Sequence, residues 1–175
     1  MYIRFGAMIL TAMVVMYAAM FVSAYEWSHI RFSVSRVFMA LTMGGTMGLI
    51  MLAWMLNMYK NTNANLVIVA LSVLLLAVGT YLDRSQTTVQ DTEFMTAMIP
   101  HHSMAITRAE RSELADFRVC ELAVAISEAQ RREILEMRWL VDDIRTNGVA
   151  GTSDEATDRP IPDFDRPAER VCPPG

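Results

Sequence analysis

Residues 37–59 read VFMALTMGGTMGLIMLAWMLNMY and contain no charged side chain. Two further stretches share this property, residues 5–25 and 61–82, although residues 61–65 begin the latter with polar side chains. A helix needs about 20 mostly apolar residues to cross the hydrocarbon core of a bilayer. Because backbone polar groups cannot stay unpaired in lipid, we expect three transmembrane helices, at about residues 5–25, 37–59 and 65–82.

These stretches have two interpretations other than a membrane anchor. They could form the core of a soluble protein, but the 93 residues after position 82 are too few to cover three such helices. The first stretch could instead be a signal peptide, since small residues at 22–24 offer a cleavage site. Its apolar run exceeds the usual core of about 7–15 residues, which favours an uncleaved helix.

Charge divides the chain in the same way as hydropathy. Residues 1–82 carry four basic and one acidic side chain, a net charge of +3, whereas residues 83–175 carry 11 Arg and 18 acidic side chains, a net charge of −7. Phosphate recognition needs a basic face, so the acidic half argues against nucleic acid as a partner. It is compatible with a cation.

The distribution of Lys and Arg gives only a weak prediction of orientation. Arg4 and Lys60 would lie on one side of the membrane, and Arg31, Arg36 and Arg84 on the other. An uncleaved first helix with a cytoplasmic amino terminus places the carboxyl-terminal half outside, and a cleaved signal peptide gives the same result. We therefore expect the carboxyl-terminal domain to lie outside the cytoplasm, which in a bacterium is the periplasmic side of the inner membrane.

The second half of the chain has the pattern of two helices. One is expected at about residues 88–114, with Pro100 inside it and a kink there. The next is expected to begin after Asp116, a good N-cap, and to end at Gly148. Residues 149–175 hold five of the six prolines and read as a disordered acidic tail.

The expected fold class is therefore all-α, with three transmembrane helices in residues 1–82 and a water-soluble antiparallel helical hairpin in residues 83–148. A tail of residues 149–175 follows. A hairpin of two helices buries little surface alone. It is expected to complete a bundle by forming a homo-oligomer or by docking on the membrane part.

The two cysteines, Cys120 and Cys172, do not have the spacing of a structural zinc site. They could form a disulfide in an oxidising compartment. They could equally be two unrelated thiols.

Methionine is abundant, with 15 residues, and it is concentrated in the first two apolar stretches. Thioether sulfur is a soft ligand suited to Cu(I) and Ag(I), and it binds without losing a proton. The alternative is that Met fills an apolar core with a flexible side chain, and for these helices that interpretation is favoured. The methionines in question are Met8, Met13, Met16, Met20, Met39, Met43, Met47, Met51, Met55 and Met58.

A second group of soft ligands lies in the predicted hairpin. Met95, Met98 and His102 are spaced i, i+3, i+7, which places them on one helix face. Glu133 and Met137 lie on one face of the next helix. Folding the hairpin at about residue 115 brings residue 101 level with about 130, and residue 98 level with about 133. The two faces therefore converge, as a metal site requires, with His101 and Met104 on a neighbouring face.

Residues 91–140 closely resemble the bacterial family called domain of unknown function 305. The strings MIPHH at 98–102 and QRREILEMRWL at 130–140 carry most of the likeness. The matching positions are Asp91, Phe94, Met95, residues 98–102, Ala105, Ile106, Leu122, Ala123, Gln130, Glu133, Ile134, Met137, Trp139 and Leu140.

The resemblance implies a ferritin-like, exported and copper-linked protein. One departure is Arg108, where many members carry Met, because a cation there cannot ligate a metal and would repel one. The ligands that the resemblance implies are Met95, Met98, His101, His102, Met104 and Met137.

These observations predict a non-enzymatic membrane protein that binds Cu(I), with Ag(I) as a second candidate ion. One alternative is a structural or adaptor membrane protein whose methionines only pack, associated with a metal exporter. Another is a redox enzyme that oxidises Cu(I), although the sequence offers no electron acceptor. Nucleophilic catalysis has no support, since no G-x-S-x-G motif is present and Cys120 has no His near it in sequence.

Overall fold

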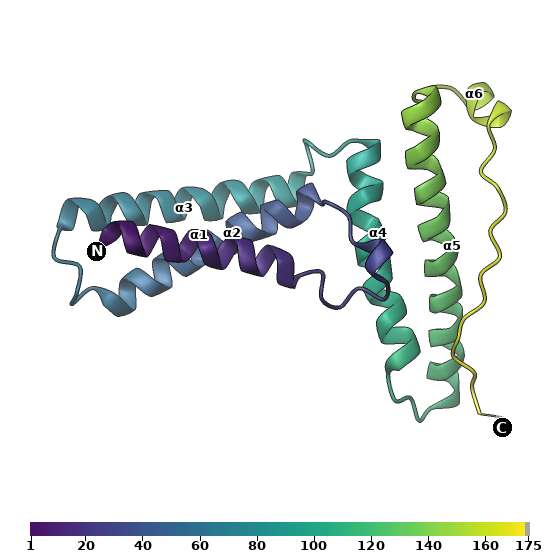
Figure 1. Ribbon diagram of the computed structural model, residues 1–175, viewed down its shortest axis with the longest axis horizontal. Coiled ribbons are helices and arrows are strands. Elements are labelled where there is room, and N and C mark those ends of the chain that lie inside the picture. Colours follow the sequence, from purple (N-terminus) through teal and green to yellow (C-terminus); the bar gives the residue numbers. More distant parts are fainter. Residues whose placement is uncertain (174–175) are drawn as a thin grey trace. The chain divides into compact units, whose positions relative to one another are not determined.

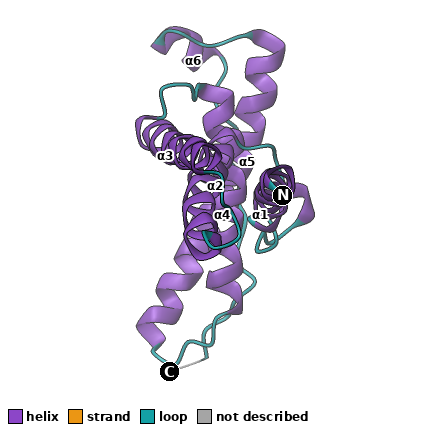
Figure 2. Ribbon diagram, turned by 90° about the vertical axis from the view of Figure 1, so that its left-hand side faces the viewer, coloured by secondary structure: helices purple, strands orange, loops and turns teal. Residues whose placement is uncertain are grey.

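The computed structural model describes residues 1–173, and these contain helices and loops but no strand (Figures 1 and 2). The all-α prediction is therefore confirmed for the described part of the chain. The elements are α1 (Tyr2–Ala19), the short 3-10 helix η1 (Trp27–His29), α2 (Val34–Met55), α3 (Thr62–Ser85), α4 (Asp91–Arg111), α5 (Phe117–Asn147) and α6 (Ser153–Asp158).

By length and composition, α1, α2 and α3 are each long and apolar enough to cross a membrane. Each begins three residues before its expected start, and polar residues cap α2 and α3. The side chain of Ser33 accepts a hydrogen bond from the backbone N–H of Arg36 at the start of α2. Asn61 caps α3 in the same way, through the N–H of Ala64 at 3.1 Å.

The chain divides into two compact units, which are described separately. Unit 1 comprises residues 1–22 and 33–89, and unit 2 comprises residues 23–32 and 90–175. This division differs from the expected boundaries of 1–82, 83–148 and 149–175 in one important respect. The loop between α1 and α2 packs with the second half of the chain, whereas sequence reasoning left it with the apolar helices.

Within unit 1, glycines let α2 approach both of its neighbours closely. A Cβ on Gly44 would lie 2.3 Å from Sδ of Met13 in α1. A Cβ on Gly45 would lie 2.5 Å from the backbone oxygen of Ser72 in α3. The Gly44-x-x-x-Gly48 face therefore meets neighbouring helices, and α2 is the central helix of unit 1.

Some of the methionines of α1 and α2 gather in one apolar cluster of unit 1. Its buried members are Phe5, Ile9, Leu52 and Tyr59. Partly buried methionines pack against them, namely Met13, Met47, Met51 and Met55. Met39 and Met43, at the other end of the α2 series, are exposed. The methionines of α2 are therefore packed toward its carboxyl-terminal end and exposed toward its amino-terminal end.

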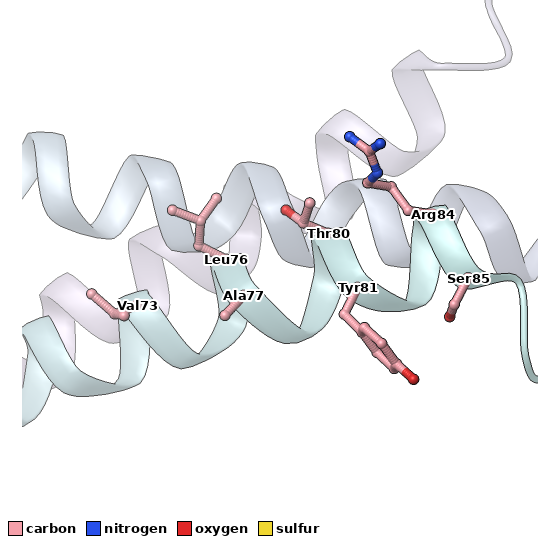
Figure 3. A pocket seen from close by; sticks show the side chains of 7 residues that line it. All are labelled: Val73, Leu76, Ala77, Thr80, Tyr81, Arg84 and Ser85. Atoms are coloured by element: carbon pink, nitrogen blue, oxygen red, sulfur yellow. The ribbon is translucent and has the colours of Figure 1, made fainter.

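The outer face of α3 carries a shallow apolar groove (Figure 3). It is lined by Val73, Leu76 and Ala77, and it ends at Tyr81 and Arg84. Tyr and Arg at the end of an apolar helix are typical of the boundary between lipid and water, where an amphipathic side chain can reach the headgroups. The groove is thus an apolar surface of unit 1 that ends in two amphipathic side chains.

Unit 2 is built around the antiparallel pair α4 and α5, which lie side by side in Figure 1. The predicted caps are confirmed. Asp116 accepts a hydrogen bond from the N–H of Arg118 at 2.9 Å, and Gly148 ends α5 with φ of 81°. Pro100 lies inside α4, which continues through it.

Residues 149–173, which lie in the expected disordered tail, contain a short helix and a segment that contacts α5. Thr152 and Glu155 form a capping box that starts α6, a local signal hidden by the acidic and proline-rich composition. The segment after α6 returns along α5 (Figure 1), where Cys172 forms a disulfide with Cys120. The structure thus decides between the two interpretations of the cysteines in favour of the bond.

Candidate functional site

Three of the predicted ligands lie together at the interface of α4 and α5. Met95 and Met137 belong to one buried core cluster, and Met98 packs against it. The buried aliphatic members of the cluster are Ile99, Ile106, Ile134 and Val141. Met95 is 6% exposed and Met137 is 9% exposed, so both thioethers are shielded from water. The predicted convergence of the two helix faces is therefore present.

His102 lies one helical turn beyond Met98 and faces α5. Its Nδ1 is 3.0 Å from Oε2 of Glu133, which is itself one turn from Met137. The angles do not make this contact a hydrogen bond, and Nδ1 is buried with no hydrogen-bond partner among the described residues. Gln130 also belongs to this face, because its Nε2 donates to Glu133 at 3.4 Å. The expected matching, which set residue 98 level with about 133, is therefore off by about one helical turn, because the observed contact joins residues 102 and 133.

The surroundings of His102 favour a neutral imidazole. Burial lowers the pKa of His102 below the ordinary histidine value, and the nearby His101 acts in the same direction. The carboxylate of Glu133 opposes this shift without reversing it. Since only the neutral ring can bind a metal ion, His102 is in the form that a ligand requires at neutral pH.

The other two predicted ligands are placed differently. His101 is exposed, with its ring centroid 6.0 Å from that of His102. Met104 is half-buried and lies outside the core cluster. Arg108 is exposed. Across residues 1–173, no group of three or more His, Cys, Asp and Glu side chains is placed to hold a metal ion. Any metal site at this interface would therefore depend on thioether ligands.

A cavity of about 670 Å³ in unit 2 reaches the buried methionines from one end of the helix pair. Met95 and Met137 both line it, and Phe94 and Ile161 contribute apolar surface. Arg159 lies at its wall and donates to Asp143 at 2.7 Å. This cavity gives the thioethers a route to solvent that does not require α4 and α5 to separate.

Sequence reasoning missed a buried polar group centred on Ser103, which is 0% exposed. Its Oγ accepts a hydrogen bond from the backbone N–H of Tyr25 at 2.7 Å and lies 2.9 Å from Nδ1 of His29. Burial lowers the pKa of His29, and Arg138, Arg131 and Arg31 act in the same direction against Glu26. The sequence signal for this group was Ser103 itself, a polar residue at a position of α4 where an apolar side chain is expected.

A second buried group was also missed, and it holds the end of the chain. Oγ of Ser127 donates to Glu110, and Arg131 pairs with Glu110 at 3.3 Å and with Glu169 at 3.0 Å. The guanidinium of Arg131 also lies 4.9 Å from the ring centroid of Tyr25. These contacts join α4, α5, the 23–32 segment and the carboxyl-terminal segment into one unit.

Comparisons with known proteins agree with the resemblance of the hairpin. An uncharacterized protein of Acanthamoeba polyphaga mimivirus is 28% identical over 145 residues, which cover 79% of this chain and 93% of that protein. No solved structure matches the chain. Residues 80–160 match the model of the family described as Domain of unknown function (DUF305), and this match, which includes α4 and α5, supports the assignment of that segment to the DUF305 family.

Proposed function

We propose that this protein is a membrane-anchored receptor for a soft metal ion, Cu(I) or its analogue Ag(I), and that it is not an enzyme. The ion would be held between α4 and α5 by Met95, Met98, His102 and Met137, with His101 and Met104 as a second set. The observation that carries the proposal is the gathering of three methionines in one shielded cluster, one turn from a neutral histidine.

The chemistry of these ligands fits a monovalent soft ion better than zinc. Thioethers favour Cu(I), whereas imidazole serves either ion. Glu133 adds a negative charge beside His102, and a carboxylate at one ring nitrogen can orient the other nitrogen toward a metal. The cavity at Met95 and Met137 provides an entry route.

The site is tested by replacing Met98 with Leu and His102 with Gln in the same chain. These changes keep volume and helix propensity roughly constant while removing two ligands. We expect Cu(I) affinity to fall about a hundredfold, which corresponds to about 2.7 kcal/mol. The measurement is competition with a chromogenic Cu(I) chelator, using the full chain in mild detergent and circular dichroism to check helix content.

Two further variants make this test specific. The exposed pair Met39→Leu and Met43→Leu removes two thioethers from α2 and should leave the affinity unchanged. His101→Gln with Met104→Leu should weaken binding less than the first pair. Unchanged binding in the folded Met98→Leu, His102→Gln variant contradicts the site. Native mass spectrometry of the same sample counts ions and chains, and we expect a homo-oligomer.

We further propose that α1, α2 and α3 span the bacterial inner membrane in contact with lipid, with unit 2 in the periplasm. With three spans, the 23–32 loop and the residues after α3 must emerge on the same side. These are the two pieces that form unit 2. The bond between Cys120 and Cys172 is in keeping with an oxidising compartment.

Orientation is tested by fusing alkaline phosphatase, which is active only outside the cytoplasm, after Gly148. We expect full activity from this fusion and none from a matched fusion after Lys60, in the α2–α3 loop. The reverse pattern, with activity only after Lys60, would show that unit 2 faces the cytoplasm.

A further inference from the structure

Unit 2 contains a second cavity, of about 170 Å³, which is separate from the methionine cluster in its chemistry. The floor is apolar and comes from α4 and α5. The polar wall consists of Arg131 and Arg138 from α5, Arg166 from the carboxyl-terminal segment, and Tyr25, Glu26 and His29 from the 23–32 segment. Three parts of the chain that are distant in sequence therefore meet around one small space.

Two of the three arginines in this wall have no carboxylate partner within residues 1–173. Arg131 already has two carboxylate partners, Glu110 and Glu169. Arg138 donates to the backbone oxygen of Ser28 at 3.2 Å, and neither it nor Arg166 lies within ion-pair distance of a carboxylate among the described residues. Two of the three guanidinium groups that line the cavity are thus without an ion pair in the described part of the chain, and the one carboxylate in its lining there, that of Glu26, lies 3.5 Å from Nε2 of His29.

The spacing of the arginines along α5 places two of them on one face of the helix. Arg131 and Arg138 are seven residues apart, which is about two turns, so they project from the same face. A guanidinium presents several N–H donors in a plane and matches the oxygens of a phosphate or carboxylate. The volume admits a small anion of this kind but is too small for a nucleotide.

We propose that this cavity binds a phosphate-type oxyanion, held by Arg138 and Arg166. The anion would pair with these two guanidinium groups and tie the carboxyl-terminal segment to α5. Its source is either free phosphate or the phosphate of a lipid headgroup. This inference does not depend on metal binding, because none of the cavity-lining arginines belongs to the methionine site.

The test uses the full chain in mild detergent, with inorganic phosphate as the probe in calorimetric titration. In the variant Arg138→Gln with Arg166→Gln we expect phosphate affinity to fall about tenfold or more, because two charge-assisted contacts are lost. The matched control is Arg132→Gln with Arg145→Gln, which removes the same charge from exposed positions of α5 outside the cavity. This control should bind phosphate as the unaltered protein does.

A second arm distinguishes the two sources. Phosphatidic acid and phosphatidylcholine are offered in mixed micelles, and retained lipid is counted by native mass spectrometry. Selective retention of phosphatidic acid that is lost in the cavity variant, with weak binding of free phosphate, identifies a lipid headgroup. The proposal is overturned if the unaltered protein binds neither probe, or if the folded cavity variant binds both as well as the control does.

Discussion

Breaking the bond between Cys120 and Cys172 is expected to lower the free energy of unfolding of unit 2 by about 4 kcal/mol. The two residues are separated by 52 positions, and the closed loop contains most of α5, all of α6 and the returning segment. A crosslink that closes a loop of this length removes about that much conformational freedom from the unfolded chain. The effect is a large fraction of the stability of a small domain.

The measurement compares the full chain with the variant Cys120→Ala, Cys172→Ser, using native-state hydrogen exchange of α5 amides in increasing urea. Arg170→Gln is the matched control, because it keeps the disulfide and loses hydrogen bonds to backbone oxygens of Ala109 and Glu110. We expect this control to lose only about 1–2 kcal/mol. Equal stability of the oxidised and bond-free chains would show that the returning segment is held by its other contacts alone.

Replacing Glu110 with Ala is expected to destabilise unit 2 by about 3 kcal/mol at neutral pH. The Glu110 side chain is 5% exposed and accepts hydrogen bonds from Ser127 and from the backbone N–H of Glu169. Its loss leaves these donors unpaired and deprives Arg131, itself largely buried, of one carboxylate. Removing one member of a buried ion pair costs about 3–5 kcal/mol, and the remaining Glu169 offsets part of that.

The pKa of Glu110 also predicts how the stability of unit 2 depends on pH. Burial alone would raise the pKa of Glu110, but hydrogen bonds from Ser127, Glu169 and Arg170 and the charge of Arg131 outweigh it, so the pKa lies below the ordinary value of 4.5. A carboxyl with a lowered pKa in the folded state stabilises the fold above the unfolded pKa, and this contribution is lost as pH falls through the folded value.

Acid unfolding therefore measures how much the charge of Glu110 contributes to stability. The unaltered protein should lose stability below about pH 4.5, and Glu110→Gln should show a smaller loss over the same range. Glu113→Gln, an exposed change near the end of α4, is the control and should leave the profile unchanged. An identical acid profile for Glu110→Gln would mean that the charge of Glu110 contributes no stability.

Sequence patterns were sufficient for the five long helices, α1 to α5, and for the pairing of α4 with α5. Charge-free stretches located α1 to α3, and Asp116 and Gly148 marked the ends of α5, because caps and hydropathy act over a few residues. The expectation that residue 98 lies level with about residue 133 followed from helix geometry and from the position of the turn between α4 and α5. It brought the faces of Met98 and His102 and of Glu133 and Met137 together correctly, but about one helical turn out of register with the observed contact of His102 and Glu133.

The remaining contacts could not be predicted from local patterns. The 23–32 segment has no helical or strand period, and its attachment depends on Tyr25 and His29 meeting a serine more than 70 positions away. The returning segment is fixed by Glu169, Arg170 and Cys172, whose partners lie about 50–60 positions earlier. Charged and proline-rich composition predicted disorder there because composition does not report partners at such separations.

Because the 23–32 segment belongs to unit 2, this unit is assembled from two pieces that the ribosome makes at different times. Residues 23–32 are synthesised first, then α2 and α3, and only afterwards α4, α5 and the segment bearing Cys172. Tyr25 and His29 must therefore wait, without their serine partner, until both later apolar helices have been made. Unit 2 is complete only when the segment that bears Cys172 has been synthesised as well.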